Sequence, residues 1–196
     1  MQHCYHLGMI VEGRTERLIL RPQSVADAEQ IQEVFPHWDV VRYLMNVVPW
    51  PYPADGALSY IRDVAVPQME RGEAWHWTIR LATEPQQIIG SISLKKSSRE
   101  NRDKDHRGFW LATKWQGQGL MSEACVWVND FWFDTLGMPV MRVSKAVGNA
   151  ASRRISEKHG MRLIGHGEKE YVSGKLASEI FEITREEWRA WKAQRD

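Results

Sequence analysis

The 196-residue sequence contains almost no cysteine, because Cys4 and Cys125 are its only two. They lie far apart and form no Cys-x-x-Cys pair, so neither a disulfide framework nor a zinc site of the usual spacing is supported. His3 and His6 flank Cys4, and we interpret this group as part of a tail rather than as metal ligands. So little cysteine suits a reducing compartment, and we expect a cytoplasmic protein without a metal.

Long apolar runs and an excess of one charge are missing too. No stretch of about 18 apolar residues could span a bilayer, and the N-terminal residues lack the basic start and apolar block of a secretory signal. The 26 basic and 25 acidic side chains give a net charge of +1. No long-range field would therefore attract the chain to nucleic acid or to an anionic membrane. We expect a protein that binds neither, in which any anion site is local.

What the chain does contain is a regular change between strand and helix periodicity. The expected strands are residues 15–22, 74–81, 87–95, 107–112, 140–147, 161–166 and 177–183, and the expected helices are 24–35, 55–71, 119–136, 149–159 and one that begins at Thr184. The polar run 97–106 is interpreted as a hairpin loop. This order predicts an α/β fold with a mixed, mostly antiparallel central sheet of about six to seven strands flanked by helices. We expect one domain over residues 14–194 behind a flexible tail of residues 1–13.

The segment KWQGQGLMSEA, residues 114–124, places two glycines between an expected strand and an expected helix. At Gly117 and Gly119 backbone amides can face outward without a Cβ in the way, and the helix adds its positive end. Such a turn can bind phosphate groups. A Walker A loop is absent, and a dinucleotide fingerprint would need a third glycine where Ser122 stands. A glycine-rich turn without a ligand is the remaining alternative.

This segment resembles the pyrophosphate loop [QR]xxGx[GA] of the GNAT superfamily of acyl-CoA-dependent N-acetyltransferases, with Lys114 in place of the usual glutamine or arginine. Further segments are similar to the branch that acetylates the N-termini of ribosomal proteins. They are TERLILRP at residues 15–22, IIGSISL at 88–94, and NAASRRISEKHGM at 149–161. The four segments follow the order of the family along nearly the whole chain. The resemblance implies a sheet that is splayed in the middle to hold acetyl-CoA.

The resemblance also implies which residues hold that co-substrate. Main-chain groups of Leu111, Ala112 and Thr113 are expected to pair with the pantetheine arm. Amides of Gln116, Gly117, Gln118, Gly119, Leu120 and Met121 are expected to hold the pyrophosphate. Asn149 is expected to bond the arm, although a role as a helix N-cap is the alternative. Ser152, one helical turn further on, is expected to face the same way as Asn149.

The family's chemistry is a direct attack of an amine on the thioester, without a covalent enzyme intermediate. The resemblance suggests that Ser152 donates a hydrogen bond to the leaving sulfur; the alternative is an ordinary residue of the helix N-terminus. His106 and His76 are candidates for relaying a proton, because histidine titrates near neutral pH. Each could instead be structural. An α-amine with a pKa near 8 could also rely on water or a weak base.

We therefore expect an N-acetyltransferase whose acceptor is a primary amine, above all a protein N-terminal α-amine. A small-molecule amine such as an amino acid or antibiotic is one alternative, and a non-catalytic acyl-CoA sensor is another. The many aromatic residues suggest a wall for the acceptor pocket made of Trp50, Tyr52, Trp75 and Trp77, with filling of the core as the alternative. A homodimer is left open.

Overall fold

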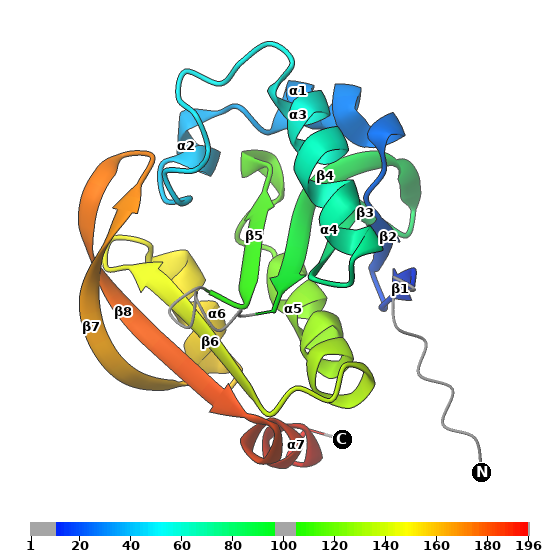
Figure 1. Cartoon of the computed structure of the whole chain (residues 1–196). Coiled ribbons are helices and arrows are strands. Elements are labelled where there is room, and N and C mark those ends of the chain that lie inside the picture. Colours follow the sequence, from blue (N-terminus) through cyan, green and yellow to red (C-terminus); the bar gives the residue numbers. More distant parts are fainter. Residues whose placement is uncertain (1–10, 97–104, 196) are drawn as a thin grey trace.

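The computed structural model describes residues 11–96 and 105–195, which form two separate sheets (Figure 1). The first sheet has five antiparallel strands in chain order: β1 (Gly13–Arg14), β2 (Leu18–Pro22), β3 (Ala74–Leu81), β4 (Glu84–Lys95) and β5 (Arg107–Leu111). The second sheet has three antiparallel strands in the order β6 (Val140–Ala146), β8 (Gly174–Thr184) and β7 (Arg162–Tyr171). The edge strands β5 and β6 face each other across a gap, so the combined sheet is splayed.

The helices begin and end where capping residues and glycines allow. A 3-10 turn (Val25–Asp27) leads into α1 (Ala28–Val34), which is followed by α2 (Trp38–Val41). One continuous helical segment consists of α3 (Gly56–Tyr60), a π turn (Ile61–Ala65) and α4 (Val66–Glu70). The remaining helices are α5 (Leu120–Asp130), which continues into a π turn (Phe131–Thr135), α6 (Ala150–Lys158) and α7 (Arg185–Ala193). Capping boxes mark the starts of the first and last helical segments. Asp27 accepts from the Ser24 amide, and Glu187 accepts from the Thr184 amide, each at 2.8 Å.

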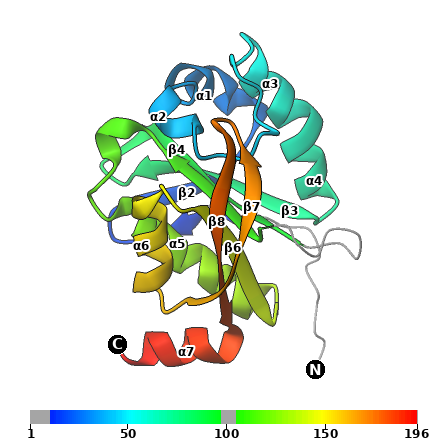
Figure 2. The same ribbon diagram turned by 90° about the vertical axis from the view of Figure 1, so that its left-hand side faces the viewer.

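Two layers of helices cover opposite faces of the first sheet (Figure 2). One apolar cluster joins α1, α2 and α3 to Ile88 of β4. A larger cluster lies between the other face and α5, and it includes Leu20, Trp77 and Ile89. Adjacent residues of β4 therefore face opposite layers, as the two-residue period of a strand requires.

The splayed α/β fold expected from the sequence is confirmed, with some differences in extent. Eight strands are found in the described residues, because β1 adds a short strand before β2. Gly13 belongs to β1, and the Val11 carbonyl accepts from Trp77 Nε1 at 2.8 Å, so the last residues of the expected tail are held by the fold. The β7–β8 hairpin is longer than its apolar segments indicated. Most of the expected loop 97–106 lies outside the described residues.

Candidate active site

Strands β5 and β6 are joined at one end only. The His106 amide donates to the Arg142 carbonyl, and the Arg142 amide donates to His106 Nδ1, both at 2.9 Å. Asp105 Oδ1 accepts from the Ser144 amide at 2.8 Å. Within the described ranges no other backbone group bridges the two strands, and they diverge toward their C-terminal ends (Figure 1). The gap is therefore wedge-shaped, with His106 at its closed end.

The edge of β5 that faces the gap carries backbone groups without a neighbouring strand. The Ala112 amide donates to the Ile89 carbonyl at 2.8 Å, so Ala112 bonds toward β4. Because successive residues of a strand direct their backbone groups to alternate sides, Phe109 and Leu111 direct theirs into the gap. The Leu111 carbonyl accepts from Gln116 Nε2 at 2.8 Å. An extended chain with amide groups could pair with this edge as an added strand.

The glycine turn lies at the open end of the gap. Gly117 has φ of +75° and Gly119 has φ of +78°, a left-handed conformation that strongly favours glycine. Gly119 is the N-cap of α5. The first amides of the helix, from Leu120 to Ser122, have no carbonyl of their own helix within reach. They form a cluster of donors at the positive end of an eleven-residue helix.

The turn is supported from β2 and the residues before it. Glu123, in the first turn of α5, accepts hydrogen bonds from the Arg17 amide at 2.9 Å and from Arg17 Nε at 2.7 Å. Thr15 Oγ1 donates to the same carboxylate. Arg17 Nη1 also donates to the Gln118 carbonyl at 3.1 Å. Arg17 therefore connects the strand, the helix and the turn, and it fixes the direction in which the turn amides point.

The first turn of α6 faces the same gap. Asn149 is the N-cap, and its Oδ1 accepts from the Ser152 amide at 3.2 Å. The capping alternative for Asn149 is thus present, and its side-chain NH2 group remains a donor on the gap side. Ser152 is buried, and no described residue shares a hydrogen bond with its hydroxyl group. Ser152 and Asn149 both line the cavity, so the hydroxyl group and the amide NH2 group are placed to act on a ligand.

These parts surround one cavity of about 1010 Å³ that runs through the gap. This is at the upper end of the usual range for a small-molecule site. Of the expected site residues, those that line it are Leu111, Gln116, Gly117, Gly119, Leu120, Met121, Asn149 and Ser152. Ala112, Thr113 and Gln118 belong to the same segments but do not line the cavity. The structure therefore brings the two expected segments, 111–121 and 149–152, to one site.

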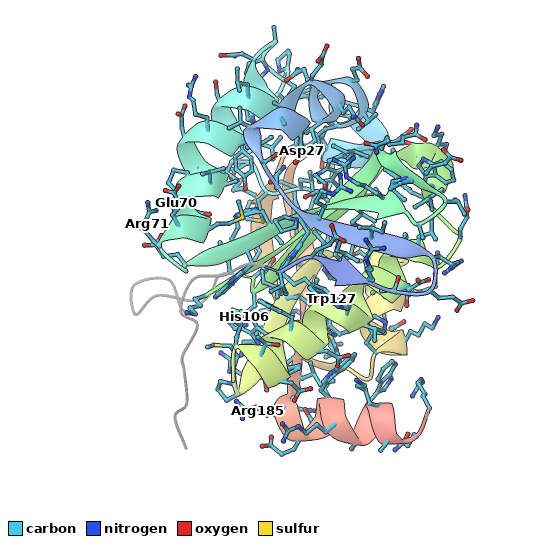
Figure 3. The ribbon with its side chains drawn as sticks, turned by 90° about the vertical axis from the view of Figure 1, so that its right-hand side faces the viewer. Asp27, Glu70, Arg71, His106, Trp127 and Arg185 are labelled. Atoms are coloured by element: carbon cyan, nitrogen blue, oxygen red, sulfur yellow. The ribbon has the colours of Figure 1, made fainter. Side chains whose placement is uncertain are left out.

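Neither histidine expected to relay protons lines the cavity. His106 closes the narrow end, where its ring stacks on Trp132 at 5.0 Å and burial lowers its pKa. Figure 3 shows His106 beside α5. His76 is enclosed between Tyr60 and Gln68, and burial lowers its pKa to about 3. Both positions fit structural histidines, and the geometry gives neither a path to a ligand.

The expected aromatic wall is wrong for all four of its residues, because none lines the cavity. Trp75 and Trp77 are core residues that meet Phe131 edge to face. Trp50 is half exposed on the outer surface, and Tyr52 packs on Phe35. Alternation in β3 places large aromatic side chains under α5, where burial of apolar area outweighs any use in a pocket.

A different group of residues lines the end of the cavity away from the glycine turn. It comprises Asp39, Tyr43, Met45, Gln68, Lys95, Asp105, Lys145, Lys169, Glu170 and Tyr171. Sequence reasoning missed all of them. They come from six separate segments, and no spacing pattern connects them. The polar alternation of GEKEY at 167–171 was the one available signal, and it indicated only an exposed strand.

The segment after α2 closes this end by pairing with the tip of the β7–β8 hairpin. The Asn46 amide donates to the Glu170 carbonyl at 3.1 Å, and the Val172 amide donates to the Leu44 carbonyl at 2.9 Å. Met45 and Tyr171 form a β-bridge. Figure 1 shows this segment beside the hairpin tip. We call residues 42–46 with 170–174 the strap, and its residues Tyr43, Leu44, Met45, Glu170 and Tyr171 line the cavity.

No group of three or more His, Cys, Asp or Glu side chains converges as metal ligands in residues 11–96 and 105–195. In the same ranges, none of the helices combines the length and apolar character needed to cross a bilayer. The donors at the glycine turn are backbone amides, which bind anions rather than cations.

A known protein family matches most of the chain. The sequence profile described as the acetyltransferase (GNAT) domain matches residues 17–162, which include β2, β5, the glycine turn and α6. The chain belongs to this family. It is therefore an enzyme of the acetyltransferase class, whose members use acetyl-CoA.

Individual relatives are distant but cover almost the whole chain. YdaF of Bacillus subtilis (strain 168), assigned as a ribosomal N-acetyltransferase, is 25% identical over 182 residues, which are 90% of this chain and 96% of that protein. The solved ribosomal-protein-S5-alanine acetyltransferase of Vibrio fischeri has a TM-score of 0.75 at 17% identity, covering 91% of this chain and 99% of its own. Mycobacterium smegmatis RimJ in complex with CoA-disulfide also has a TM-score of 0.75, at 17% identity, over 90% of this chain and 88% of its own. These structures show that the fold is shared.

Proposed function

We propose that this enzyme binds acetyl-CoA in the gap between β5 and β6 and transfers the acetyl group directly to the α-amine of a protein N-terminus. The observation that supports it most is the single cavity that connects the glycine turn, the free edge of β5 and the strap. The residues present fit the co-substrate. Turn amides suit a pyrophosphate, and the Phe109 and Leu111 backbone groups suit the amides of a pantetheine arm.

The protein's part in this chemistry is to orient the reactants and to offer polar groups where charge develops. The amides of 116–121 bind and position the phosphates. Ser152 Oγ donates a hydrogen bond toward the sulfur, and Asn149 holds the first turn of α6 in place as its cap. Bound acetyl-CoA supplies an activated thioester. Asp105 or Glu170, which line the far end of the cavity, would accept a proton from the attacking amine directly or through water.

The preference for an α-amine is supported by its chemistry and by the strap. An α-amine has a pKa of about 8 and is partly unprotonated near neutral pH, whereas a lysine amine has a pKa of about 10.4. At this end the carboxylates of Asp39, Asp105 and Glu170 lie among three lysines, so the charges nearly balance and a carboxylate is available to accept a proton from the amine. The strap presents the backbone of residues 44–46 and 170–172 beside the cavity, and the end of an extended chain could lie along it. The distant relatives named for ribosomal proteins agree with this acceptor, and a cytoplasmic location would follow from it.

A coupled assay of thiol release tests the proposal. Acetyl-CoA is mixed with the enzyme and with three acceptor groups: peptides with free N-termini, the same peptides with blocked N-termini and an internal lysine, and small amines including amino acids. We expect release of CoA with free N-termini only, and intact-mass analysis should show one added acetyl group at the N-terminus. Preference for the small amines would favour a small-molecule acetyltransferase. Acetyl-CoA binding without release with any acceptor would favour a sensor.

A further inference from the structure

Two cations are buried in the wall of the cavity without a carboxylate partner. Arg107 of β5 and Lys145 of β6 both line the cavity, and their exposed fractions are 2% and 7%. Neither forms an ion pair with a described residue. Arg107 Nη1 donates to Asn129 Oδ1, but its buried Nε has no hydrogen-bond partner. Burial of unpaired charge is costly, so such charges are retained where a function needs them.

Lys145 extends across the gap from β6 to β5. Its Nζ lies 4.8 Å from the centre of the Phe109 ring, and Cys125 of α5 is close enough to affect its pKa. The backbone groups of Phe109 are the next along β5 after those of Leu111 that face the gap, in the direction away from the glycine turn. A chain held by its phosphates at the turn and paired with β5 would therefore carry its far end to Lys145.

Lys145 lies too far from the glycine turn to bind the phosphate groups of the co-substrate. Cys125, its neighbour on α5, is five residues beyond Leu120 at the helix N-terminus, which corresponds to about 7.5 Å along the axis. The amides of the turn bind anions at the helix N-terminus, whereas Lys145 lies deeper in the wedge. The anion expected at that depth is the one that forms during the reaction.

We propose that Lys145 is a catalytic residue, whose ammonium group stabilises the negative charge on the sulfur of the leaving CoA thiolate and gives it a proton. This inference rests on the proposed function. As the amine nitrogen bonds to the carbonyl carbon and the C–S bond breaks, the bond's electron pair passes to sulfur. Lys145 Nζ donates one proton to that sulfur, and it regains a proton from solvent or from the attacking amine. Ser152 and Lys145 would approach the sulfur from α6 and β6 respectively.

The surroundings of Lys145 suit this role. Burial, followed by the charge of Arg107, lowers its pKa from 10.5 to about 8, while the charge of Asp105 opposes this shift. Cys125 also opposes the shift, and Lys169 of β7 adds to it. An ammonium group with a pKa near that of a thiol, about 8.5, is well matched to share a proton with it.

The test uses the thiol of bound CoA as a reporter that does not depend on turnover. The ultraviolet absorbance of the thiolate is titrated for CoA bound to the wild-type protein, Lys145→Met and Lys145→Gln, after subtraction of the free-protein spectrum. A nearby ammonium should lower the pKa of the bound thiol by about one unit or more relative to both variants. Lys145→Arg should retain part of that shift. Lys175→Met, an exposed lysine at the hairpin tip, serves as the control and should behave as wild type.

Turnover provides the second measurement. With a good acceptor, both neutral variants should lose about 100-fold in kcat with little change in the KM of acetyl-CoA. The fall in wild-type kcat above a pH of about 8 should disappear in the variants. An identical thiol pKa in wild type and variants, or an unchanged kcat, would overturn the role of Lys145. If no acceptor releases CoA, the proposed function fails, but the thiol titration still decides whether Lys145 contacts the sulfur. Failure of CoA to bind the wild-type protein would contradict both.

Discussion

The two ends of the cavity differ in how many parts of the chain build them. At the glycine turn, the continuous segment 116–122 supplies backbone amides from one turn and one helix. At the strap end, side chains come from six segments, which are α2 with the residues after it, α4, β4, the residue Asp105 before β5, β6 and β7. The first end depends on local backbone conformation, and the second depends on the assembly of the whole fold. Under the proposed function, single substitutions should therefore alter the acceptor end, whereas the co-substrate end depends on one backbone conformation.

The largest effect is expected at the glycine turn. Gly119→Val adds a β-branched side chain at φ of +78° and near the amides that face the ligand. Acetyl-CoA should bind at least about 100-fold more weakly by calorimetry, because several donors turn away together. Gly72→Val is the matched control, since Gly72 also has a positive φ, of +63°, and lies outside the cavity. Both variants should lose similar stability, and equal affinity in the two would contradict the special role of the turn.

The next effect concerns Lys145, which lines the cavity beside Phe109. Its pKa is lowered from 10.5 to about 8 in the folded protein, so the unfolded chain binds the proton more tightly between these pH values. Stability should therefore rise as the pH increases from about 8 to 10.5. Lys145→Met removes the cost and should be more stable than wild type by on the order of 2 kcal/mol at pH 7. Urea unfolding at pH 7 and pH 10 measures this, and the advantage should shrink at pH 10.

Loss of stability in Lys145→Met at pH 7 would show that the ammonium has a stabilising partner. That result would remove the argument that a function maintains the buried charge.

A smaller effect is expected from Ser152 at the first turn of α6. Ser152→Ala should lower kcat by about ten-fold and leave acetyl-CoA affinity unchanged, because the hydrogen bond to sulfur strengthens only as charge develops. Ser156→Ala tests the same change one turn further along α6, outside the cavity lining, and should keep the wild-type kcat. Equal kcat values for the two variants would show that Ser152 has a structural role in α6 and no role in catalysis.

The smallest effect should come from the strap. Tyr171 Oη and Ser178 Oγ share a hydrogen bond of 2.7 Å that anchors the hairpin tip. Tyr171→Phe removes it, at a cost of about 1 kcal/mol. We expect about a three-fold higher KM for the acceptor and no change for acetyl-CoA, measured by varying each substrate in turn. A rise in the acetyl-CoA KM instead would mean that the strap acts on the co-substrate end.

The same contrast explains what the sequence could predict. The sequence could predict Gly117, Gly119, Asn149 and Ser152, because turns and helix caps depend on residues that are close in the chain. The resemblance of four segments to one family then indicated that these residues lie at one site. The sequence could not predict a role for Lys145, because its neighbours in the chain indicate only that it belongs to a strand. Its burial against Phe109 depends on how β5 and β6 of the two sheets meet.

The tryptophans show the opposite error. Trp75 and Trp77 flank His76 in the sequence, which suggested the wall of a pocket. In the structure, β3 is buried on both faces between two helix layers. Composition cannot distinguish an aromatic core from an aromatic pocket, since both bury the same type of surface. The strap could not be predicted either. Its hydrogen bonds join residues 44–46 to 170–172 through backbone groups, and backbone hydrogen bonds do not require particular residue types.

The crystal structure of the protein with CoA is the most direct test of how the cavity is used. The account predicts the pyrophosphate on the amides of residues 116–121, the pantetheine arm along Phe109 and Leu111, and the sulfur within hydrogen-bond distance of Lys145 Nζ and Ser152 Oγ. Phosphates bound away from the glycine turn, or a sulfur that contacts neither side chain, would contradict it.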